Sequence, residues 1–147
     1  MKIVDLLKRE SVELNGKVTS KPEAIEKMVA LMAAGGNLAD VEAYKKGVFA
    51  REEESTTGIG EGIAIPHAKT AAVKAPGLAA MVVKDGVDYD SLDGEPANLI
   101  FLIAAPDTED NVHLEVLSRL SMLLMDPDFR TRLMEAENVD AFFKCID

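Results

Sequence analysis

Residues 57–70 read Thr57-Gly58-Ile59-Gly60-Glu61-Gly62-Ile63-Ala64-Ile65-Pro66-His67-Ala68-Lys69-Thr70, a glycine-rich turn followed by a short apolar run. The apolar residues 63–65 predict a buried strand. Pro66 has no N–H for a sheet ladder and favours extended backbone before it, so we expect the strand to end there. His67 is then expected where a strand leaves its sheet, a common location for reactive groups in α/β domains.

The composition predicts one globular domain over residues 1–147. The chain is 48% hydrophobic and 29% charged, a normal globular balance, and its length allows a real core. Its 26 acidic and 16 basic residues give a net charge of −10. This charge argues against a nucleic-acid-binding face, which needs a basic surface, and suits a basic protein partner.

Cysteine usage and hydropathy predict a cytoplasmic protein. The single cysteine, Cys145, excludes an internal disulfide framework and fits a reducing compartment, and its helical context favours a packing role. Residues 1–10 carry charges every few positions, unlike a signal peptide. No apolar run approaches the ~20 residues of a transmembrane helix, so we expect no membrane insertion.

Upstream of the glycine-rich turn the chain predicts an edge strand and two helices. Residues 11–15 alternate and end in Asn-Gly, which favours the strand. Ser20 and Glu23 form a capping box for a helix that Gly35-Gly36 ends. Asp40 is the expected N-cap of a second helix, which runs to about residue 54.

Two continuous apolar runs, residues 78–83 and 99–104, predict central strands covered on both faces. Residues 87–89 predict a further short strand. The predicted fold class is therefore α/β, a single mixed β-sheet flanked by helices.

Three helices are expected after the last strand. Asp110-Asn111 is the predicted cap of the first, whose apolar arc is wide enough to indicate deep packing. Pro127 is expected to open the next helix, and Asn138 to cap the last one.

Two histidines suggest the chemistry. His113 falls in the first turn of the predicted helix after residue 104. If both strands deliver their ends to one side of the sheet, the imidazoles of His67 and His113 meet there. A neutral imidazole is a nucleophile, and the Arg51 guanidinium suits phosphate oxygens. The hydroxyls of Thr56 and Thr57 are expected donors beside it.

These groups together predict a site that accepts a phosphoryl group by in-line transfer, with donors spread around the developing charge. Gly62 is expected to let the backbone approach the phosphoryl group without a Cβ in the way. No metal or cofactor is expected, because a zinc site needs three or four ligands at set spacing.

The stretch 57–69 resembles the fructose/mannitol-type enzyme IIA family of the bacterial phosphoenolpyruvate:sugar phosphotransferase system. In that family a motif like Gly-Ile-Gly-x-Gly-Ile-Ala-Ile-Pro-His carries the phosphorylated histidine, which implies His67. Arg51-Glu52 is similar to the family's active-site arginine, and the His-Leu-x-x-Leu motif at residues 113–117 is similar to its second histidine. The likeness also covers residues 20–36 and 126–130, and in effect spans about residues 5–147.

The resemblance implies a phosphoryl relay and a mixed α/β sandwich of the enzyme IIA type. The phosphocarrier HPr would donate to His67 at Nε2, and a cysteine of enzyme IIB would receive the group for sugar uptake through the membrane component, enzyme IIC. A fructose-type sugar is favoured. Two departures matter: Ala68 stands where glycine is common, and the acids Glu61 and 52–54 are expected to face away from the phosphoryl group.

Other functions stay open on the sequence alone. A regulatory protein of the same fold, from the nitrogen-related branch, would use phosphorylation to control a partner. A metal-assisted hydrolase using both histidines is a third possibility. A dinucleotide-binding loop is disfavoured, because the glycines at 58, 60 and 62 precede a strand instead of opening a helix.

Each candidate residue also has a purely structural interpretation. His67 would be a strand-end histidine, His113 a helix-capping histidine, and Arg51 the partner of a neighbouring acid. Residues 55–57 would form only a helix-stop loop, which leaves Thr56 and Thr57 as the weakest candidates.

Overall fold

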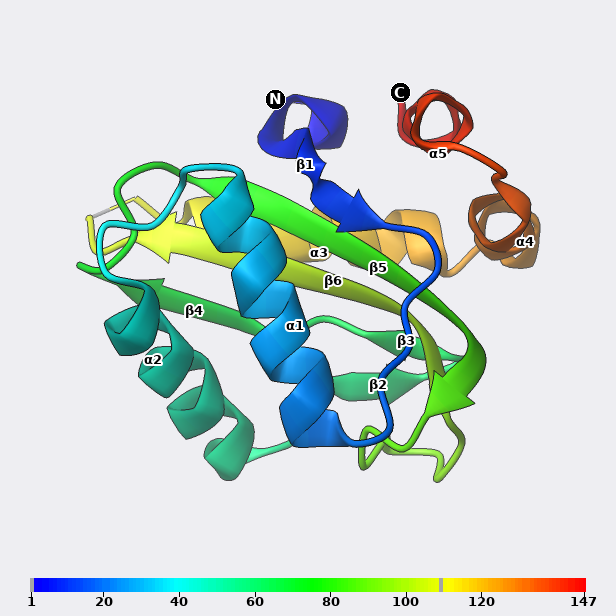
Figure 1. Ribbon diagram of the computed structural model, residues 1–147, viewed down its shortest axis with the longest axis horizontal. Coiled ribbons are helices and arrows are strands. Elements are labelled where there is room, and N and C mark those ends of the chain that lie inside the picture. The colour runs from blue at the N-terminus through cyan, green and yellow to red at the C-terminus, as the bar shows by residue number, and fades with distance from the viewer. Residues whose placement is uncertain (1, 109) are drawn as a thin grey trace.

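A six-stranded mixed sheet forms the middle layer of the molecule in the computed structural model, which describes residues 2–108 and 110–147 and, for residue 112, the backbone alone (Figure 1). The strands are β1 (Leu7–Glu13), β2 (Gly58–Gly60), β3 (Ile63–Ala64), β4 (His67–Thr70), β5 (Gly77–Val87) and β6 (Ala97–Pro106). The helices are η1 (Ile3–Leu6), α1 (Lys21–Ala34), α2 (Val41–Glu54), α3 (Val112–Leu124), α4 (Pro127–Glu135) and α5 (Val139–Ile146).

The sheet order is β1-β5-β6-β3-β2, and β4 also pairs with β6. Strands β5 and β6 are antiparallel neighbours, whereas β3 and β4 both run parallel to β6. Within the part of the chain that the structure describes, β1 pairs only with β5, which confirms the predicted edge strand, although β1 begins four residues earlier than residues 11–15 suggested. The α/β fold class with one mixed sheet is confirmed.

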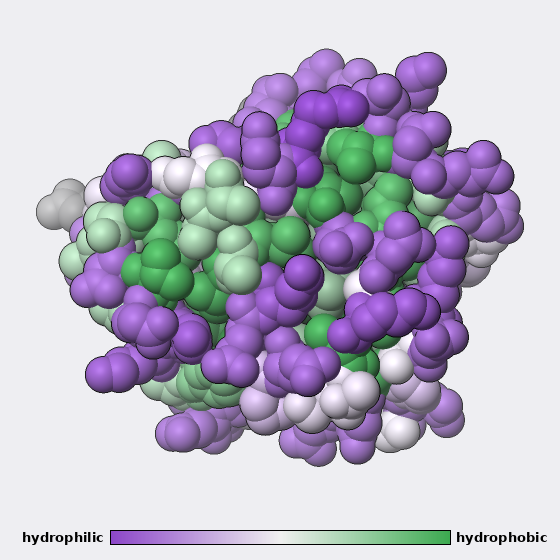
Figure 2. Space-filling model, in the orientation of Figure 1, coloured by the Kyte–Doolittle hydropathy of each residue, from purple (hydrophilic) through white to green (hydrophobic). Residues whose placement is uncertain are grey.

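Helices cover both faces of the sheet, α1 and α2 on one side and α3 on the other (Figure 1). Side chains alternate along β5, so residues 79, 81 and 83 join the core beneath α1 and α2, while residues 78, 80 and 82 join the core beneath α3, α4 and α5. The strand is thus buried on both faces, as the continuous apolar runs predicted. Polar side chains cover most of the α1–α2 face, with smaller apolar areas between them (Figure 2).

The helix boundaries follow local capping chemistry. The Ser20 hydroxyl accepts the Glu23 N–H at 3.3 Å to begin α1, and Gly36 adopts the left-handed φ of +79° that ends it. The Asp40 carboxylate accepts the Ala43 N–H at 3.1 Å to begin α2. The predicted caps at these positions are confirmed.

His67 begins a strand, which corrects the expectation that it follows one. Strand β3 ends at Ala64, and Pro66 interrupts the ladder because it has no N–H. The chain then re-forms its pairing along the same neighbour, with His67 opposite Ile103 of β6. The Pro66 carbonyl accepts the Ile103 N–H at 3.0 Å across this break. His67 therefore lies inside the sheet, at a break between two strand segments.

The glycine-rich turn is a tight hairpin between β2 and β3, which are antiparallel. Glu61 and Gly62, its two central residues, have φ of 56° and 76°. Two consecutive left-handed residues are the signature of the hairpin turn that matches the twist of its strands, and glycine accepts that conformation readily. The hairpin accounts for the Glu61-Gly62 pair.

Two further expectations were wrong. Residues 87–89 do not form a separate strand, because Val87 is the last residue of β5 and the chain then turns. Helix α3 is not packed on all of its apolar arc: Val116, Leu120 and Leu124 are buried, whereas Leu114 and Met122 are exposed. Within the described residues, every helix is too short or too polar to cross a bilayer.

Candidate active site

A cleft of about 650 Å³ opens between α2, β4 and the start of α3. We call it the His67 cleft and define it by its lining residues, which are Gly47, Ala50, Arg51, Glu54, His67, Ala68, Lys69, Thr70, His113, Leu114 and Leu117. The structure thus brings together three residues that the sequence singled out, Arg51, His67 and His113, from three different elements. All three side chains are partly exposed.

Close packing of α2 on the sheet fixes one wall of the cleft. The buried Tyr44 hydroxyl donates to the Ile103 carbonyl at 2.8 Å, beside the position where His67 pairs with β6. At Gly47 a Cβ would lie 3.4 Å from the Thr70 methyl group, so a small residue suits this close contact with β4. The helix therefore holds its last two turns against the strand that carries His67.

The Arg51 side chain is anchored at the end of α2. Its Nη1 donates to the Ser55 carbonyl at 3.0 Å and lies 3.4 Å from the Ser55 hydroxyl. Both acceptors are neutral, so these two contacts do not offset the positive charge of the guanidinium. Its other N–H groups can still donate to an incoming anion. Glu54 also lines the cleft, contrary to the expectation that the acids of residues 52–54 face away.

The His67 ring is oriented by one hydrogen bond to its own backbone segment. Its Nδ1 lies 2.9 Å from the Ile65 carbonyl oxygen, which can only accept a hydrogen bond. Nδ1 must therefore carry the hydrogen, and in the neutral ring Nε2 keeps the free lone pair. A carbonyl two residues upstream thus selects which nitrogen is the nucleophile.

His113 is the second residue of α3, and its Nδ1 is buried without a hydrogen-bond partner among the described residues. Burial lowers the pKa of the His113 imidazole below its ordinary value of 6.5, and the nearby His67 and Lys69 lower it further. His113 is therefore neutral at pH 7, and its Nδ1 can still form a hydrogen bond. Its place at the start of a helix also favours anions nearby.

Lys69 is a cleft residue that the sequence interpretation did not single out. It follows His67 by two positions on β4, so both side chains lie on one face of the strand while Ala68 is buried on the other. Its Nζ donates to the Asp110 carbonyl at 3.1 Å, just before the start of α3. Strand periodicity would have found Lys69, had β4 been predicted.

Thr56 and Thr57 are not among the residues that line the His67 cleft. Thr57 is buried, and both its N–H and its hydroxyl donate to the Glu52 carboxylate, the N–H at 3.0 Å. Lys21 pairs with the same carboxylate at 3.0 Å, and the Tyr89 hydroxyl lies 3.3 Å from the Thr57 hydroxyl. We call these four residues, Lys21, Glu52, Thr57 and Tyr89, the Glu52 cluster.

Thr56 adjoins this cluster. Its hydroxyl donates to the Tyr89 carbonyl at 3.1 Å and accepts from the Gly58 N–H at the same distance. Lys21 Nζ also lies 3.2 Å from it. These contacts leave the Thr56 hydroxyl fully engaged within the protein.

Gly62 and Glu61 also lie away from the cleft. Gly62 lines a separate surface pocket with Asn98, whose side-chain oxygen would be 3.2 Å from an added Cβ. The Glu61 carboxylate lies 3.8 Å from the Arg130 guanidinium. Glu61 and Glu52 thus face away from His67, as expected.

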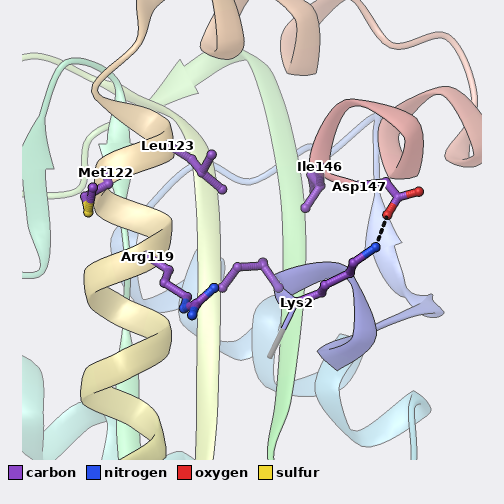
Figure 3. Close-up of a pocket in the computed structure, with 7 residues that line it drawn as sticks. Lys2, Arg119, Met122, Leu123, Ile146 and Asp147 are labelled. Atoms are coloured by element: carbon purple, nitrogen blue, oxygen red, sulfur yellow. Dashed lines mark ion pairs between the residues drawn. The ribbon is translucent and has the colours of Figure 1, made fainter.

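A second cleft, of about 450 Å³, lies near the chain ends between η1, α3 and α5 (Figure 3). Met122, Leu123 and Ile146 give it an apolar lining. The ion pair marked in Figure 3, Lys2–Asp147 at 3.6 Å, is exposed to solvent. Its lining residues, among those that the structure describes, include no histidine, cysteine, serine or threonine. Among the described residues no cluster of three or more His, Cys, Asp or Glu is placed to hold a metal ion.

Residues 5–147 match the model of the family described as the phosphoenolpyruvate-dependent sugar phosphotransferase system, EIIA 2. The chain is 51% identical over 147 residues to the fructose-specific EIIABC component of the phosphotransferase system of Bacillus subtilis. That alignment covers 100% of this chain but 23% of the relative, so the chain spans about a quarter of that relative's length.

Two solved structures share the fold. The nitrogen regulatory protein IIA-Ntr from Neisseria meningitidis superposes with a TM-score of 0.90 at 30% identity, covering 99% of each chain. Enzyme IIAMTL of Escherichia coli, in its complex with phosphorylated enzyme IIBMTL, superposes with a TM-score of 0.83 at 27% identity, covering 96% of this chain and 98% of that one.

Proposed function

Because the chain belongs to the EIIA 2 family of the phosphoenolpyruvate-dependent sugar phosphotransferase system, we propose that it is a phosphocarrier that takes up a phosphoryl group on His67 and hands it to a second protein. Residues 1–147 then act as one EIIA domain in the cytoplasm. The site consists of His67, Arg51 and His113. Thr56, Thr57 and Gly62 are left out of it, since each has a structural role elsewhere.

One observation carries this proposal: the Nδ1–H of His67 is bound by the Ile65 carbonyl, in a cleft that also contains Arg51 and His113. The lone pair of Nε2 attacks phosphorus, and the bond between phosphorus and the donor nitrogen breaks, leaving its electron pair on the donor. The Nδ1 hydrogen stays in place, so no proton moves in the step. The Ile65 carbonyl also stabilises the positive ring that results.

Arg51 and His113 have separate roles in this step. The Arg51 guanidinium offers N–H donors to the phosphoryl oxygens, over which charge spreads in the transition state. A neutral His113 donates one hydrogen bond without adding a positive charge that would strengthen the hold on the phosphoryl group. A carrier must release what it accepts, so this moderate stabilisation suits onward transfer.

Membership of the family and the relatives of the chain support a proposal for its partners. We propose phosphorylated HPr as the donor, a cysteine thiolate of enzyme IIB as the acceptor, and enzyme IIC as the membrane component that IIB serves. The thiolate attacks phosphorus, and the N–P electron pair returns to His67 Nε2. The complex of enzyme IIAMTL with phosphorylated enzyme IIBMTL supports the IIB assignment. The fructose-specific relative favours a fructose-type sugar.

The test is phosphotransfer from phosphoenolpyruvate through enzyme I and HPr. The wild type is expected to gain an acid-labile, base-stable phosphate, and His67→Ala is expected to gain none. His113→Ala is expected to accept phosphate yet pass it slowly to enzyme IIB. Normal phosphate uptake by His67→Ala would refute the proposal, and normal onward transfer by His113→Ala would remove His113 from the mechanism.

A regulatory role is the second candidate, because the nitrogen regulatory protein IIA-Ntr shares the fold over 99% of this chain. The two roles differ in the fate of the phosphate. With purified fructose-type enzyme IIB and membranes that contain enzyme IIC, a transport protein labels fructose. A regulatory protein keeps its phosphate under the same conditions and changes its affinity for a partner when phosphorylated.

A further inference from the structure

Lys69 is the cation that sits nearest to His67 in sequence and shares its face of β4. The one-residue alternation of a strand sends the side chains of positions 67 and 69 to the same side, and both line the His67 cleft. Arg51 reaches the same cleft from α2. The cleft is therefore lined by two positive side chains, Arg51 and Lys69, as well as by the two histidines.

The two cations are held differently. Arg51 is fixed by two contacts to Ser55, within its own chain segment. Among the described residues, the Lys69 ammonium makes one hydrogen bond, 3.1 Å to the carbonyl of the exposed residue Asp110, and that acceptor is neutral. A lysine ammonium has three donors on a flexible stem, so it can exchange one acceptor for another at little cost.

The Asp110 carbonyl belongs to the segment that begins α3. Asn111 is the N-cap residue of that helix and His113 is its second residue. In the unphosphorylated protein the Lys69 ammonium therefore ties β4 to the helix start that carries His113. Its positive charge is felt at the His113 imidazole, whose pKa it helps to lower, so Lys69 and His113 are electrostatic neighbours.

A phosphoryl group on His67 brings about two negative charges and three strong acceptor oxygens into this cleft. These oxygens are better acceptors for an ammonium than a solvent-exposed carbonyl, because the bond becomes charge-assisted on both sides. We propose that Lys69 is a second phosphoryl-binding cation, which exchanges the Asp110 carbonyl for a phosphoryl oxygen when His67 is phosphorylated. This inference rests on the proposed function of His67.

The exchange has a consequence for α3. When Lys69 leaves the Asp110 carbonyl, the link between β4 and the helix start is released. The phosphorylated and unphosphorylated forms then differ at the rim of the cleft, where a partner protein must dock to reach His67. A donor and an acceptor protein would thereby meet different surfaces.

The test compares Lys69→Gln with Lys69→Arg and with Lys84→Gln. Gln keeps N–H donors for the Asp110 carbonyl but removes the charge, and Arg keeps the charge. Lys84 is an exposed residue of β5 that lies outside the cleft, so its variant controls for the change in net charge. We expect phosphorylation of Lys69→Gln by phosphorylated HPr to slow by about 10- to 100-fold, the effect of one charge-assisted hydrogen bond.

Phosphorus NMR of the phosphorylated proteins separates binding from a merely structural tie. A nearby cation lowers the pKa of a phosphoryl group. The pH at the midpoint of the phosphohistidine titration should therefore be about 1 pH unit higher in Lys69→Gln than in the wild type, and unchanged in Lys69→Arg and Lys84→Gln. An unchanged midpoint in Lys69→Gln would overturn the inference while the phosphocarrier proposal stands. Absence of any phosphohistidine signal in the wild type would overturn both.

Discussion

Arg51 and Glu52 are neighbours at the end of α2, yet they belong to two polar regions with opposite characters. Arg51 lines the open His67 cleft, where His113 Nδ1 has no partner in the described part of the chain and Lys69 makes a single bond to a carbonyl. Glu52 is 5% exposed and accepts from Thr57 and Lys21 in the Glu52 cluster. The His67 cleft has donors and acceptors that are free to bind a ligand, whereas the polar groups of the Glu52 cluster are bonded to one another.

This difference separates residues for function from residues for stability. A buried polar group costs free energy unless it is paired, so the completed bonds of the Glu52 cluster stabilise the fold. The cluster joins α1, α2 and the segments before β2 and after β5 through Lys21, Glu52, Thr57 and Tyr89. It therefore holds the end of α2, and with it the guanidinium of Arg51, in place beside His67.

The largest expected effect is on the cleft side, in Arg51→Gln. Loss of the guanidinium removes donors that act on the transferring phosphoryl group, so the rate of phosphotransfer should fall by about 10²- to 10³-fold. The free energy of unfolding should change by only about 0.5 kcal/mol, because the side chain is partly exposed. Rapid-quench phosphotransfer and urea unfolding measure the two quantities. A rate within twofold of the wild type would remove Arg51 from the site.

On the cluster side, Glu52→Gln should have the reverse profile. The variant leaves the Lys21 ammonium, 19% exposed, without its carboxylate, and the free energy of unfolding should fall by about 2 to 4 kcal/mol. Glu54→Gln is the matched control, since Glu54 is exposed and lines the cleft. It should change stability by at most about 0.5 kcal/mol. Equal losses of unfolding free energy in Glu52→Gln and Glu54→Gln would contradict the claim that the Glu52 cluster stabilises the fold more than the His67 cleft does.

A smaller effect is expected for Thr57→Val, which replaces the hydroxyl with a methyl group of similar size. The Glu52 carboxylate loses one donor, so the free energy of unfolding should fall by about 1 to 2 kcal/mol. The phosphotransfer rate of the folded variant should stay within about twofold of the wild type. A large loss of rate at full stability would return Thr57 to the site that the sequence first suggested.

Local chemistry explains why much of the fold was predictable. Ser20, Asp40 and Asn138 each cap a helix with a bond to an N–H three residues on, a rule that needs no tertiary knowledge. The apolar runs of β5 and β6 are long enough to identify central strands. Strand β4 was missed because its pairing with β6 joins residues far apart in sequence, and its four residues carry no apolar pattern.

The site shows the same division. The sequence motifs brought out Arg51, His67 and His113, and the structure gathers them in one cleft. Lys69 was missed because its importance depends on β4. Thr57 was misplaced because a hydroxyl in the loop that follows the Arg51 helix can point to either side of the chain, and only the packed structure shows that it faces Glu52. The apolar pattern of α3 likewise could not show that one side of this helix is exposed, because Leu114 and Met122 look like core residues in the sequence.

The smallest expected effect concerns His113 and pH. Its pKa in the folded protein is lowered, mainly by burial and then by His67 and Lys69, whereas the unfolded chain has the ordinary value of 6.5. The unfolded state therefore binds the proton more readily, and the free energy of unfolding should fall as the pH is lowered from about 8 to 6. His113→Gln should lose part of this dependence.

Urea unfolding of both proteins across that range measures the difference, because the two proteins share every titratable group except His113. Parallel curves of unfolding free energy against pH for the wild type and His113→Gln would mean that folding does not change the pKa of His113. A shallower curve for the variant would mean that the cleft disfavours the protonated His113 imidazole, so that the folded protein loses stability as the pH falls. The lowered pKa of His113 means that the protonated imidazole is the disfavoured form, so His113 stays a neutral hydrogen-bonding group beside His67.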